Sequence, residues 1–435
     1  MAARRAPGCL WLLLLPPGAL LIVVAAGIWI SSAPVHPDRI GIPMTISVAP
    51  PPRWEAAAER ARRAALAHLA DENLPGLSVA VGVGDRVVWA EGFGYADTRT
   101  RTRVTPDVRF RIGTASIALT SAAAGLLMEQ DRLHLDGEAH ALVPGFPPRT
   151  PPVTLRDLMA HTAGLEHGVG DEGPLFTQHC EGAAEALQHF VRWPVLSEPG
   201  TEFHFSALGW IVASAAVEAA AQRPLIEFMQ ERVFQPLGMT QTGADEGPLE
   251  RDDDFPLFNL FRELVLDPRT KSGMGPAGAN MAPLRQATAY FPRFIENPRH
   301  GMHVMRPLDL SCYSGASVFV STAPDLVKFA LGVQKGKLLK PATVETLQTP
   351  QRLASGRETG YGLGWETGES AVGGRRVRSA GHSGVLLGGD VADLRIYPEQ
   401  GVAVAVLANI SHAKTRRLGE RIAAEFLKEA LGGQR

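Results

Sequence analysis

The stretch LSVAVGV at Leu77–Val83 is followed by RVVWAEGFGYA at Arg86–Ala96, with only Gly84 and Asp85 between them. Both runs are rich in residues that favour strands, and a two-residue connection containing glycine is typical of a tight hairpin turn. The pair therefore predicts two adjacent antiparallel strands near the start of a folded domain.

Strand-like runs return near the other end of the chain, as RVRSAGHSG (376–384), VADLRIYP (391–398) and VAVAVLANI (402–410). Apolar residues at helical spacing precede the first hairpin from Trp54, and a last helix is expected over about 417–431. The sequence between is mostly helical in pattern. We therefore expect an α/β (α+β) fold, with an antiparallel sheet flanked by N- and C-terminal helices and an all-helical subdomain inserted over roughly 119–336.

The chain has 435 residues, of which 45% are hydrophobic and 20% are charged. This composition is ordinary for a globular protein that is large enough for an extensive core. The formal net charge is −2 and the sequence has no long basic run. Because phosphate binding requires a clustered positive face, these features argue against nucleic acid as a partner.

The three cysteines are Cys9, Cys180 and Cys312. Since Cys9 falls in an apolar N-terminal run, at most one internal disulfide, Cys180 to Cys312, is open to the chain. No Cys/His spacing in the sequence resembles a zinc site, and we expect neither a metal nor a cofactor.

The N-terminal residues 1–32 have the pattern of a membrane segment. Arg4 and Arg5 precede the apolar run 9–30, which is about long enough to cross the hydrocarbon core of a bilayer. Positive charge before such a run favours a single-pass anchor in the cell membrane, with the main domain exported. Two prolines interrupt the run and small residues follow it, so a cleaved signal segment and a secreted or periplasmic protein remain the alternative.

A Pro-rich tether is expected over residues 33–52, which end in three consecutive prolines. Such a segment is extended and is not expected to pack. The folded domain then covers residues 53–435.

Six short sequence motifs indicate to which protein family the chain is similar. They are FRIG (110–113), LMAHTAGL (158–165), PGTEFHFSALGW (199–210), PLGM (236–239), YGLGW (361–365) and GHSG (381–384). Each is weak alone, but their order and spacing match one family over nearly all of the chain from Trp54 onward. The chain resembles the penicillin-binding-protein-like serine hydrolases, which include class C β-lactamases, D-alanyl-D-alanine peptidases and related esterases.

The resemblance implies a cleft with three walls. In the family, a serine at a helix N-terminus attacks a carbonyl carbon, helped by a lysine one turn later. A Tyr-x-Asn pair relays protons and holds the substrate amide. A strand carrying Lys-Thr-Gly, or His-x-Gly in many esterase-like members, forms the third wall, and here the resemblance maps that wall onto His382 and Gly384.

The other two walls are degenerate. The Ser-x-x-Lys positions map onto Thr114 and Ile117, and the Tyr-x-Asn positions map onto Phe205 and Ala207. An isoleucine cannot accept a proton, and loss of a positioned base typically costs about a hundred- to ten-thousand-fold in rate. Phe205 lacks the relay hydroxyl, and Ala207 offers no side-chain hydrogen bond. Thr114 keeps a hydroxyl on a stiffer, β-branched side chain. We therefore expect no intact catalytic set and essentially no acyl-enzyme turnover.

Two other side chains are candidates to replace the missing groups. Ser116 lies two places after Thr114, so on a helix it points roughly to the other side and is expected to pack behind the site. His382 could in principle serve as the base for Thr114. His161 lies within LMAHTAGL and is expected to position a loop, and the loop Asp252–Asp254 is expected to be solvated. His161 and His167 are off the spacing of a helical metal pair.

Three hypotheses follow for function. The leading one is a membrane-tethered, catalytically degenerate member of the family that binds a peptide-like or acyl small molecule without turning it over. The alternative is a slow esterase or peptidase that uses Thr114 and His382. The third is a structural partner at the membrane with an unused cleft.

Overall fold

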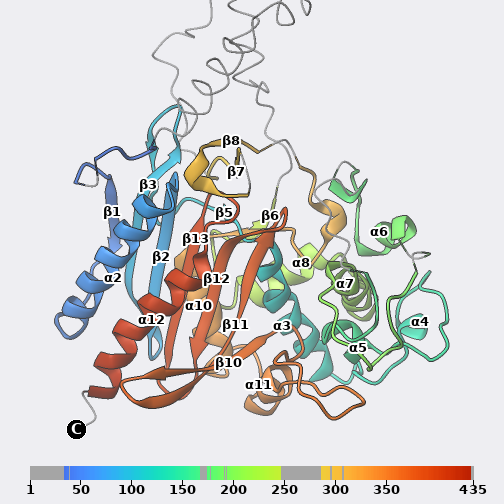
Figure 1. Cartoon of the computed structure of the whole chain (residues 1–435). Coiled ribbons are helices and arrows are strands. Elements are labelled where there is room, and N and C mark those ends of the chain that lie inside the picture. The colour runs from blue at the N-terminus through green and yellow to red at the C-terminus, as the bar shows by residue number, and fades with distance from the viewer. Residues whose placement is uncertain are drawn as a thin grey trace, which may run out of the picture.

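The computed structural model describes residues 34–38, 40–166, 174–176, 178–190, 192, 194–245, 286–293, 296–305 and 308–432 (Figure 1). The predicted membrane segment 1–32, His167 and the acidic loop Asp252–Asp254 lie outside these residues. None of the helices in the described ranges is both long enough and apolar enough to span a bilayer.

The centre of the fold is one antiparallel sheet, with the strand order β1-β3-β2-β13-β12-β11-β10 and with β4 paired to β3. The strands are β1 (Met44–Val48), β2 (Gly76–Val83), β3 (Arg86–Asp97), β4 (Thr102–Arg103), β10 (Glu366–Val372), β11 (Arg375–Leu386), β12 (Gly389–Tyr397) and β13 (Val402–Ala408). The expected hairpin 77–96 is β2 and β3. The central strand β13 pairs with β2 in the register Val406 to Val79, so the two ends of the domain meet within the sheet.

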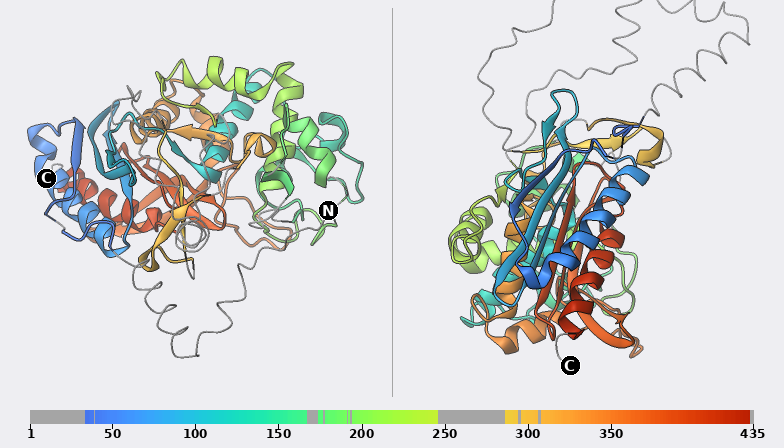
Figure 2. Two further views of the ribbon diagram at one scale, coloured as in Figure 1. Left: turned by 90° about the horizontal axis from the view of Figure 1, so that it is seen from above. Right: turned by 90° about the vertical axis from the view of Figure 1, so that its left-hand side faces the viewer.

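Two long helices cover one face of this sheet (Figure 2). They are α2 (Pro52–Asp71) and α12 (Thr415–Gly432), which pack against each other. Helix α12 also packs on β12 and β13. The buried side of α2 consists largely of alanine, and Trp54 stacks on Phe426 of α12 with ring centroids 5.8 Å apart. Small side chains let the helix approach closely, and the apolar layer between helices and sheet forms one of two cores.

The opposite face carries α10 (Ala323–Gln334) and the inserted helical region (Figures 1 and 2). The inserted helices are α3 (Ser116–Met128), α4 (Ala139–Leu142), α5 (Leu155–Met159), α6 (Ala183–Phe190), α7 (Ala207–Ala221) and α8 (Leu225–Met229), with α11 (Pro341–Gln348) following α10. Helices α3 and α7 are apolar on nearly all sides, and almost every residue in them is buried. A helix of this kind is stable only inside a core, which explains why the two lie at the centre of the insertion.

Short strands and turns also lie within or beside the insertion, which is therefore not helical throughout. They are β5 (Phe110–Arg111), β6 (Gly243–Ala244), β7 (Tyr290–Pro292), β8 (Met302–Val304) and β9 (Phe319–Ser321), with the single turns η2 (Gly113–Ala115), η3 (Pro174–Phe176), η4 (Gln230–Phe234), η6 (Pro298–His300) and η7 (Ser311–Tyr313). Cys180 and Cys312 form the disulfide that the sequence left open, with Cα atoms 4.9 Å apart. This bond joins the segments that carry η3 and η7.

The expectation that residues 33–52 do not pack is wrong for part of that segment. Met44–Val48 forms the edge strand β1 against β3, and Pro52 is the first residue of α2. Further upstream, the N–H of Val35 donates to Asn73 Oδ1 at 2.8 Å, and His36 stacks on Tyr95. The composition of the segment is Pro-rich, but open backbone groups along β3 provide a partner that composition does not reveal.

Candidate active site

A cavity of about 340 Å³ opens between β11 and the inserted helical region. Its walls hold the side chains of Thr114, Phe176, Phe205, Ala207, Tyr313, Ser317, Glu366, His382, Ser383, Val385, Leu386 and Leu387, with Gly388 completing the lining. Four residues that the sequence analysis singled out, from three separate strings, thus lie around one space: Thr114, Phe205, Ala207 and His382. Two further predicted positions are not part of the lining: Ile117, which is fully buried one turn after Thr114, and Gly384.

The turn η2 presses Thr114 against the backbone of β11. Gly113 has φ +52°, and a Cβ there would lie 2.3 Å from the carbonyl oxygen of Val385. Gly384 makes a matching approach, because a Cβ at that position would lie 2.0 Å from the carbonyl oxygen of Ile112. The absence of a Cβ at both glycines therefore lets the turn that carries Thr114 and the strand that carries His382 meet backbone to backbone.

The hydroxyl of Thr114 is engaged on both sides by this contact. Thr114 Oγ1 donates to the carbonyl oxygen of Ser383 at 3.2 Å and accepts the N–H of Val385 at 2.9 Å. The side chain is 3% exposed. A hydroxyl has a single proton to donate, so the proton that a nucleophile must give up points at a carbonyl oxygen, which is not a useful base.

No base stands in the lysine position. Ile117 lies in α3 with no exposed surface and belongs to the larger apolar core. Ser116 also fits its expected orientation, because its Oγ accepts the N–H of Phe319 at 3.3 Å and the residue is absent from the cavity lining. Of the predicted Ser-x-x-Lys positions, only Thr114, in the turn η2 before α3, therefore lines the cavity.

The segment that carries Phe205 and Ala207, the predicted Tyr-x-Asn positions, is held firmly. Ser206, between Phe205 and Ala207, caps α7 by accepting the N–H of Gly209 at 3.1 Å, and its own N–H donates to His161 Nδ1 at 2.9 Å. The Phe205 ring packs on the ring of His161 with centroids 4.2 Å apart. His161 thus positions this loop, as expected, and the loop delivers an aromatic face and a methyl group to the cavity.

His382 is fully enclosed, and its hydrogen bonds assign its tautomer. Nδ1 lies 2.6 Å from the carbonyl oxygen of Ser383, which can only accept, so the proton is on Nδ1. Nε2 lies 2.8 Å from Tyr361 Oη and accepts its proton. Burial lowers the pKa of His382, which favours this neutral form. The lone pair that a general base would use is therefore already taken by Tyr361.

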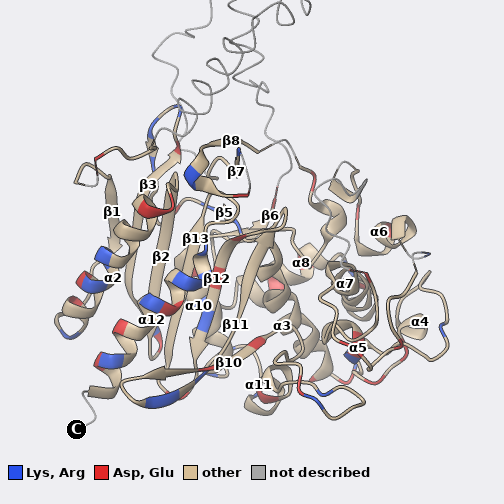
Figure 3. Cartoon of the chain, viewed as in Figure 1, with Lys and Arg blue, Asp and Glu red and all other residues tan. Residues whose placement is uncertain are grey.

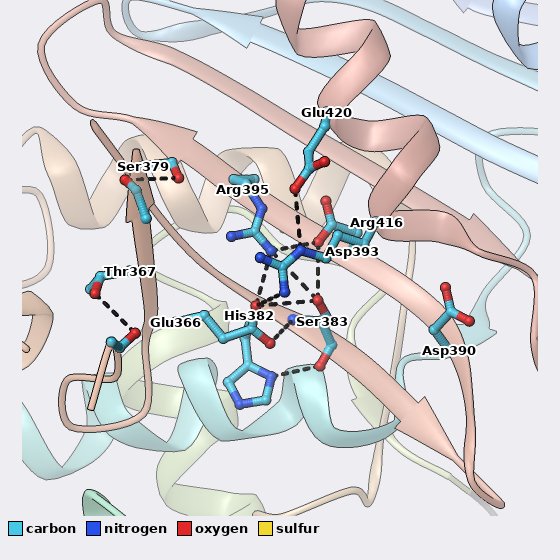
Figure 4. A network of polar contacts seen from close by, with 12 residues as sticks. Glu366, Thr367, Ser379, His382, Ser383, Asp390, Asp393, Arg395, Arg416 and Glu420 are labelled. Atoms are coloured by element: carbon cyan, nitrogen blue, oxygen red, sulfur yellow. Dashed lines mark hydrogen bonds and ion pairs between the residues drawn. The ribbon is translucent and has the colours of Figure 1, made fainter. Parts of the chain in front are cut away.

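A network of charged groups fixes the strand behind His382 (Figure 4). Glu366, at the start of β10, accepts the N–H of Ser383 at 3.0 Å and an Arg395 N–H at 3.1 Å. Burial disfavours its charge, but Arg395, the N–H of Ser383 and Arg416 nevertheless lower the pKa of Glu366 to about 2. Asp393, beside Arg395 on β12 at 2.9 Å, is completely buried, and burial raises its pKa. Arg416 of α12 completes the network with a contact of 3.1 Å to Glu366.

Several of these groups escaped the sequence analysis. Tyr361 belongs to the YGLGW string, but nothing in that string indicates a bond to His382, 21 positions away. Glu366, Asp393 and Arg395 are charged residues within strand-like runs, and a charge in a buried run is a usable signal because it requires a partner. The roles of Thr114, Ile117, Phe205 and Ala207 stay predictions.

Metal chemistry gains no support from the described residues. Cys180, His189 and Cys312 lie close enough together for a metal site, but both sulfurs are consumed in the disulfide. The carboxylates at the cavity are bound to arginine and to backbone N–H groups. What the arrangement can do is surround a small molecule with aromatic and aliphatic walls, with few uncommitted polar groups.

Comparisons with known proteins agree with this architecture. The beta-lactamase family profile matches residues 61–428. The human serine beta-lactamase-like protein LACTB, mitochondrial, is 24% identical over 488 aligned positions, covering 88% of this chain and 82% of the relative. Among solved structures, the octameric penicillin-binding protein homologue from Pyrococcus abyssi has a TM-score of 0.64 at 19% identity, covering 86% of this chain and 77% of the other. The hydrolase EstCE1, described as having promiscuous acyltransferase activity, has a TM-score of 0.65 at 22% identity, covering 86% and 99%.

The solved structures share the fold at this level of identity, and the family profile spans most of the sequence, from within α2 to within α12. It includes the turn bearing Thr114, the loop bearing Phe205 and Ala207, and the strand bearing His382. The chain belongs to the beta-lactamase family and has its serine-hydrolase scaffold.

Proposed function

We propose that this protein is a non-catalytic member of the family, which uses the retained cavity to bind a small molecule without turning it over. The observation that carries the proposal is the double engagement of Thr114 Oγ1 by the backbone of Ser383 and Val385. A nucleophile needs a base that takes its proton as the new bond forms. Thr114 has a carbonyl oxygen there instead, and Ile117 fills the lysine position.

The hydrogen bond from the N–H of Val385 to Thr114 Oγ1 also disfavours catalysis. Acyl transfer depends on N–H groups that are free to bind the oxygen on which negative charge develops. At this wall of the cavity, the N–H of Val385 is hydrogen-bonded to Thr114 Oγ1 at 2.9 Å. A substrate carbonyl would have to displace that hydroxyl, so the change from serine to threonine and the loss of the base act against the same step.

The lining indicates the chemistry of the ligand. Phe176, Phe205 and Tyr313 supply aromatic faces, and Leu386 and Leu387 supply aliphatic surface. Ser317 and Ser383 are the small polar groups among them. A mainly apolar pocket with a few polar contacts suits an acyl chain or a short peptide-like molecule.

For location, we propose that the apolar run 9–30 attaches the domain to a membrane, with residues 34–432 on the exported side. The support is the two arginines before the run and the length of the run. A cleaved segment would leave the same domain free, and comparing the mass of the mature chain with that of residues 1–435 separates the two.

The alternative is slow ester or peptide hydrolysis with Thr114 as nucleophile and His382 as base. It is favoured by one observation, namely that both side chains line the cavity and both donate to the same carbonyl oxygen, that of Ser383. For this mechanism to operate, His382 must give up the hydrogen bond from Tyr361 and turn Nε2 toward Thr114. A purely structural role would instead leave the cavity unoccupied, and no small molecule would then raise the unfolding temperature.

The test is intact-mass detection of a covalent adduct after exposure to a fluorophosphonate and to a penicillin. The matched control is the chain with Thr114→Ser, Ile117→Lys, Phe205→Tyr and Ala207→Asn together, after its thermal unfolding has shown that it is folded. We expect adducts on the control and none on the original chain. An adduct on Thr114 of the original chain, with turnover of an ester, would overturn the proposal and support the alternative.

A further inference from the structure

A group of exposed arginines lies at one end of the main sheet. The sequence DTRTRTR forms the turn between β3 and β4 and contains Arg99, Arg101 and Arg103, which we call the arginine tip. All three are exposed, and no acidic partner is recorded for any of them among the described residues. Figure 3 shows this hairpin as a basic extension at the upper end of β3.

Hydrogen bonds to a buried carboxylate fix the backbone of the arginine tip. The carboxylate of Asp97, which is 1% exposed, accepts the N–H groups of Arg99 and Thr100 at 2.8 and 3.1 Å. Asp97 also accepts the hydroxyl proton of Thr288 at 2.8 Å. A buried carboxylate thus holds the turn, on which the three arginines are exposed.

The start of the described chain is fixed beside this tip. His36 stacks on Tyr95 with ring centroids 5.4 Å apart, and Tyr95 is the residue that pairs with Arg103 across β3 and β4. Gly94 has φ +74°, and a Cβ there would lie 3.1 Å from His36 Nε2, so the approach is tight. Residues 35 and 36 therefore cannot move far from the arginine tip while the domain is folded.

The distance back to the apolar run is short. His36 follows Ile30 by six positions, and six residues span at most about 21 Å when fully extended. The screening length of physiological salt is about 8 Å. If the run 9–30 lies in a bilayer, this short tether leaves the arginine tip able to reach the lipid headgroups.

We propose that the arginine tip docks on the anionic headgroups of the membrane to which the chain is attached, and so sets the orientation of the domain. This rests on the proposed membrane attachment. Charge complementarity identifies the partner, since anionic lipid surfaces attract basic segments close to a membrane anchor. The exposed side chain of Ile40, 95% accessible, belongs to the same N-terminal approach to the sheet and adds an apolar contact of the kind that bilayer interfaces accept.

The chain offers a matched control at the other end of the sheet. Arg375, Arg376 and Arg378 begin β11, next to the turn between β10 and β11. The antiparallel order places that turn at the end of the sheet opposite to the end of β3. Replacing three arginines by glutamine at either end changes the net charge equally, although Arg376 and Arg378 also lose exposed ion pairs with Glu369 and Glu399.

The experiment uses the full chain in lipid nanodiscs, and reads hydrogen exchange of residues 97–104 by mass spectrometry. We expect slower exchange in discs with 30% phosphatidylserine, about tenfold for exposed amides, than in phosphatidylcholine discs. The slowing should vanish in high salt and in R99Q/R101Q/R103Q, and persist in R375Q/R376Q/R378Q. Equal exchange in both kinds of disc would overturn the docking while leaving the anchor intact.

If residues 9–30 do not attach the chain to a membrane, the chain will not copurify with the discs, and this result is distinct from a failure of docking. In that case the free full chain is sedimented with anionic vesicles. Binding that weakens on the order of a hundredfold in R99Q/R101Q/R103Q, roughly fivefold per arginine, upholds the docking surface. No binding, or binding that the triple variant leaves unchanged, overturns it.

Discussion

Thr114 and Val385 are 271 positions apart in sequence, yet the hydroxyl of one accepts the backbone N–H of the other at 2.9 Å. This bond links the turn before α3 to the strand that carries His382. The hydroxyl of Thr114 is thus a structural contact, and its contribution can be measured as a change in the free energy of unfolding.

Removing the Thr114 hydroxyl should therefore destabilise the protein. In Thr114→Val, the side chain keeps its shape but leaves the buried N–H of Val385 without a partner, which costs about 1–3 kcal/mol. Thr114→Ser keeps the oxygen and should change the free energy of unfolding by less than half as much. Urea denaturation of the two variants checks this, and equal stability of Thr114→Val and the original chain would show that the bond is unimportant.

The neutral state of His382 predicts a dependence of stability on pH. Burial lowers its pKa in the folded chain below the ordinary value of 6.5. The unfolded chain therefore binds more protons as the pH falls below about 6.5, and folding free energy is lost at up to about 1.4 kcal/mol per pH unit. The loss ends below the folded pKa. Buried His36 and His68 are shifted in the same direction and add to the effect.

Comparing the original chain with His382→Asn isolates the share of His382. The stability difference between them should shrink as the pH is lowered from 7.5 to 5.5 in urea titrations. Raised pKa values at Glu91, Glu218 and Asp393 act with the opposite sign, but they are common to both chains and cancel. A difference that is constant with pH would contradict a neutral His382 in the folded state.

The hydrogen bond between Tyr361 and His382 should be visible in the titration of the ring. Tyr361 Oη donates to Nε2 and so stabilises the neutral imidazole. Tyr361→Phe removes the donor, and we expect the pKa of His382 to rise while the Nδ1–H tautomer persists. Nitrogen chemical shifts of the labelled ring report both properties. A pKa that falls or stays constant would show that Tyr361 does not donate to this nitrogen.

The buried charges behind the cavity should be costly to separate. Arg395→Met leaves Asp393 uncompensated in a fully buried site, for which about 3–5 kcal/mol of destabilisation is expected. The same change at Arg376, which is 88% exposed in an ion pair with Glu369, should cost less than about 1 kcal/mol. Thermal unfolding of the two variants gives the comparison, and similar losses would contradict the burial of the network.

Sequence patterns predicted the sheet and its flanking helices because alternation, helical spacing and hairpin turns are local signals. The sequence also predicted that four residues lie at one site, because the order of the short motifs matches a family whose fold brings those motifs together. These residues are Thr114, Phe205, Ala207 and His382. The bond from Tyr361 to His382 and the pairing of Asp393 with Arg395 could not, since neither partner determines the other by spacing alone. Strand β1 was missed for a related reason. Its pairing depends on the open edge of β3. The residues of β3 that pair with Met44–Ile46 lie more than forty positions later in the sequence, so no local pattern indicates the strand.

Strand β1 has a practical consequence for anyone who shortens the chain. A cut at residue 53, the boundary that composition suggests, would remove the strand and bare the backbone of β3 between Ala90 and Phe93. An open strand edge recruits other chains, so that product would tend to aggregate although its cavity is untouched. A chain beginning at residue 34 retains its own edge protection and, with His36 on Tyr95, its closing contact.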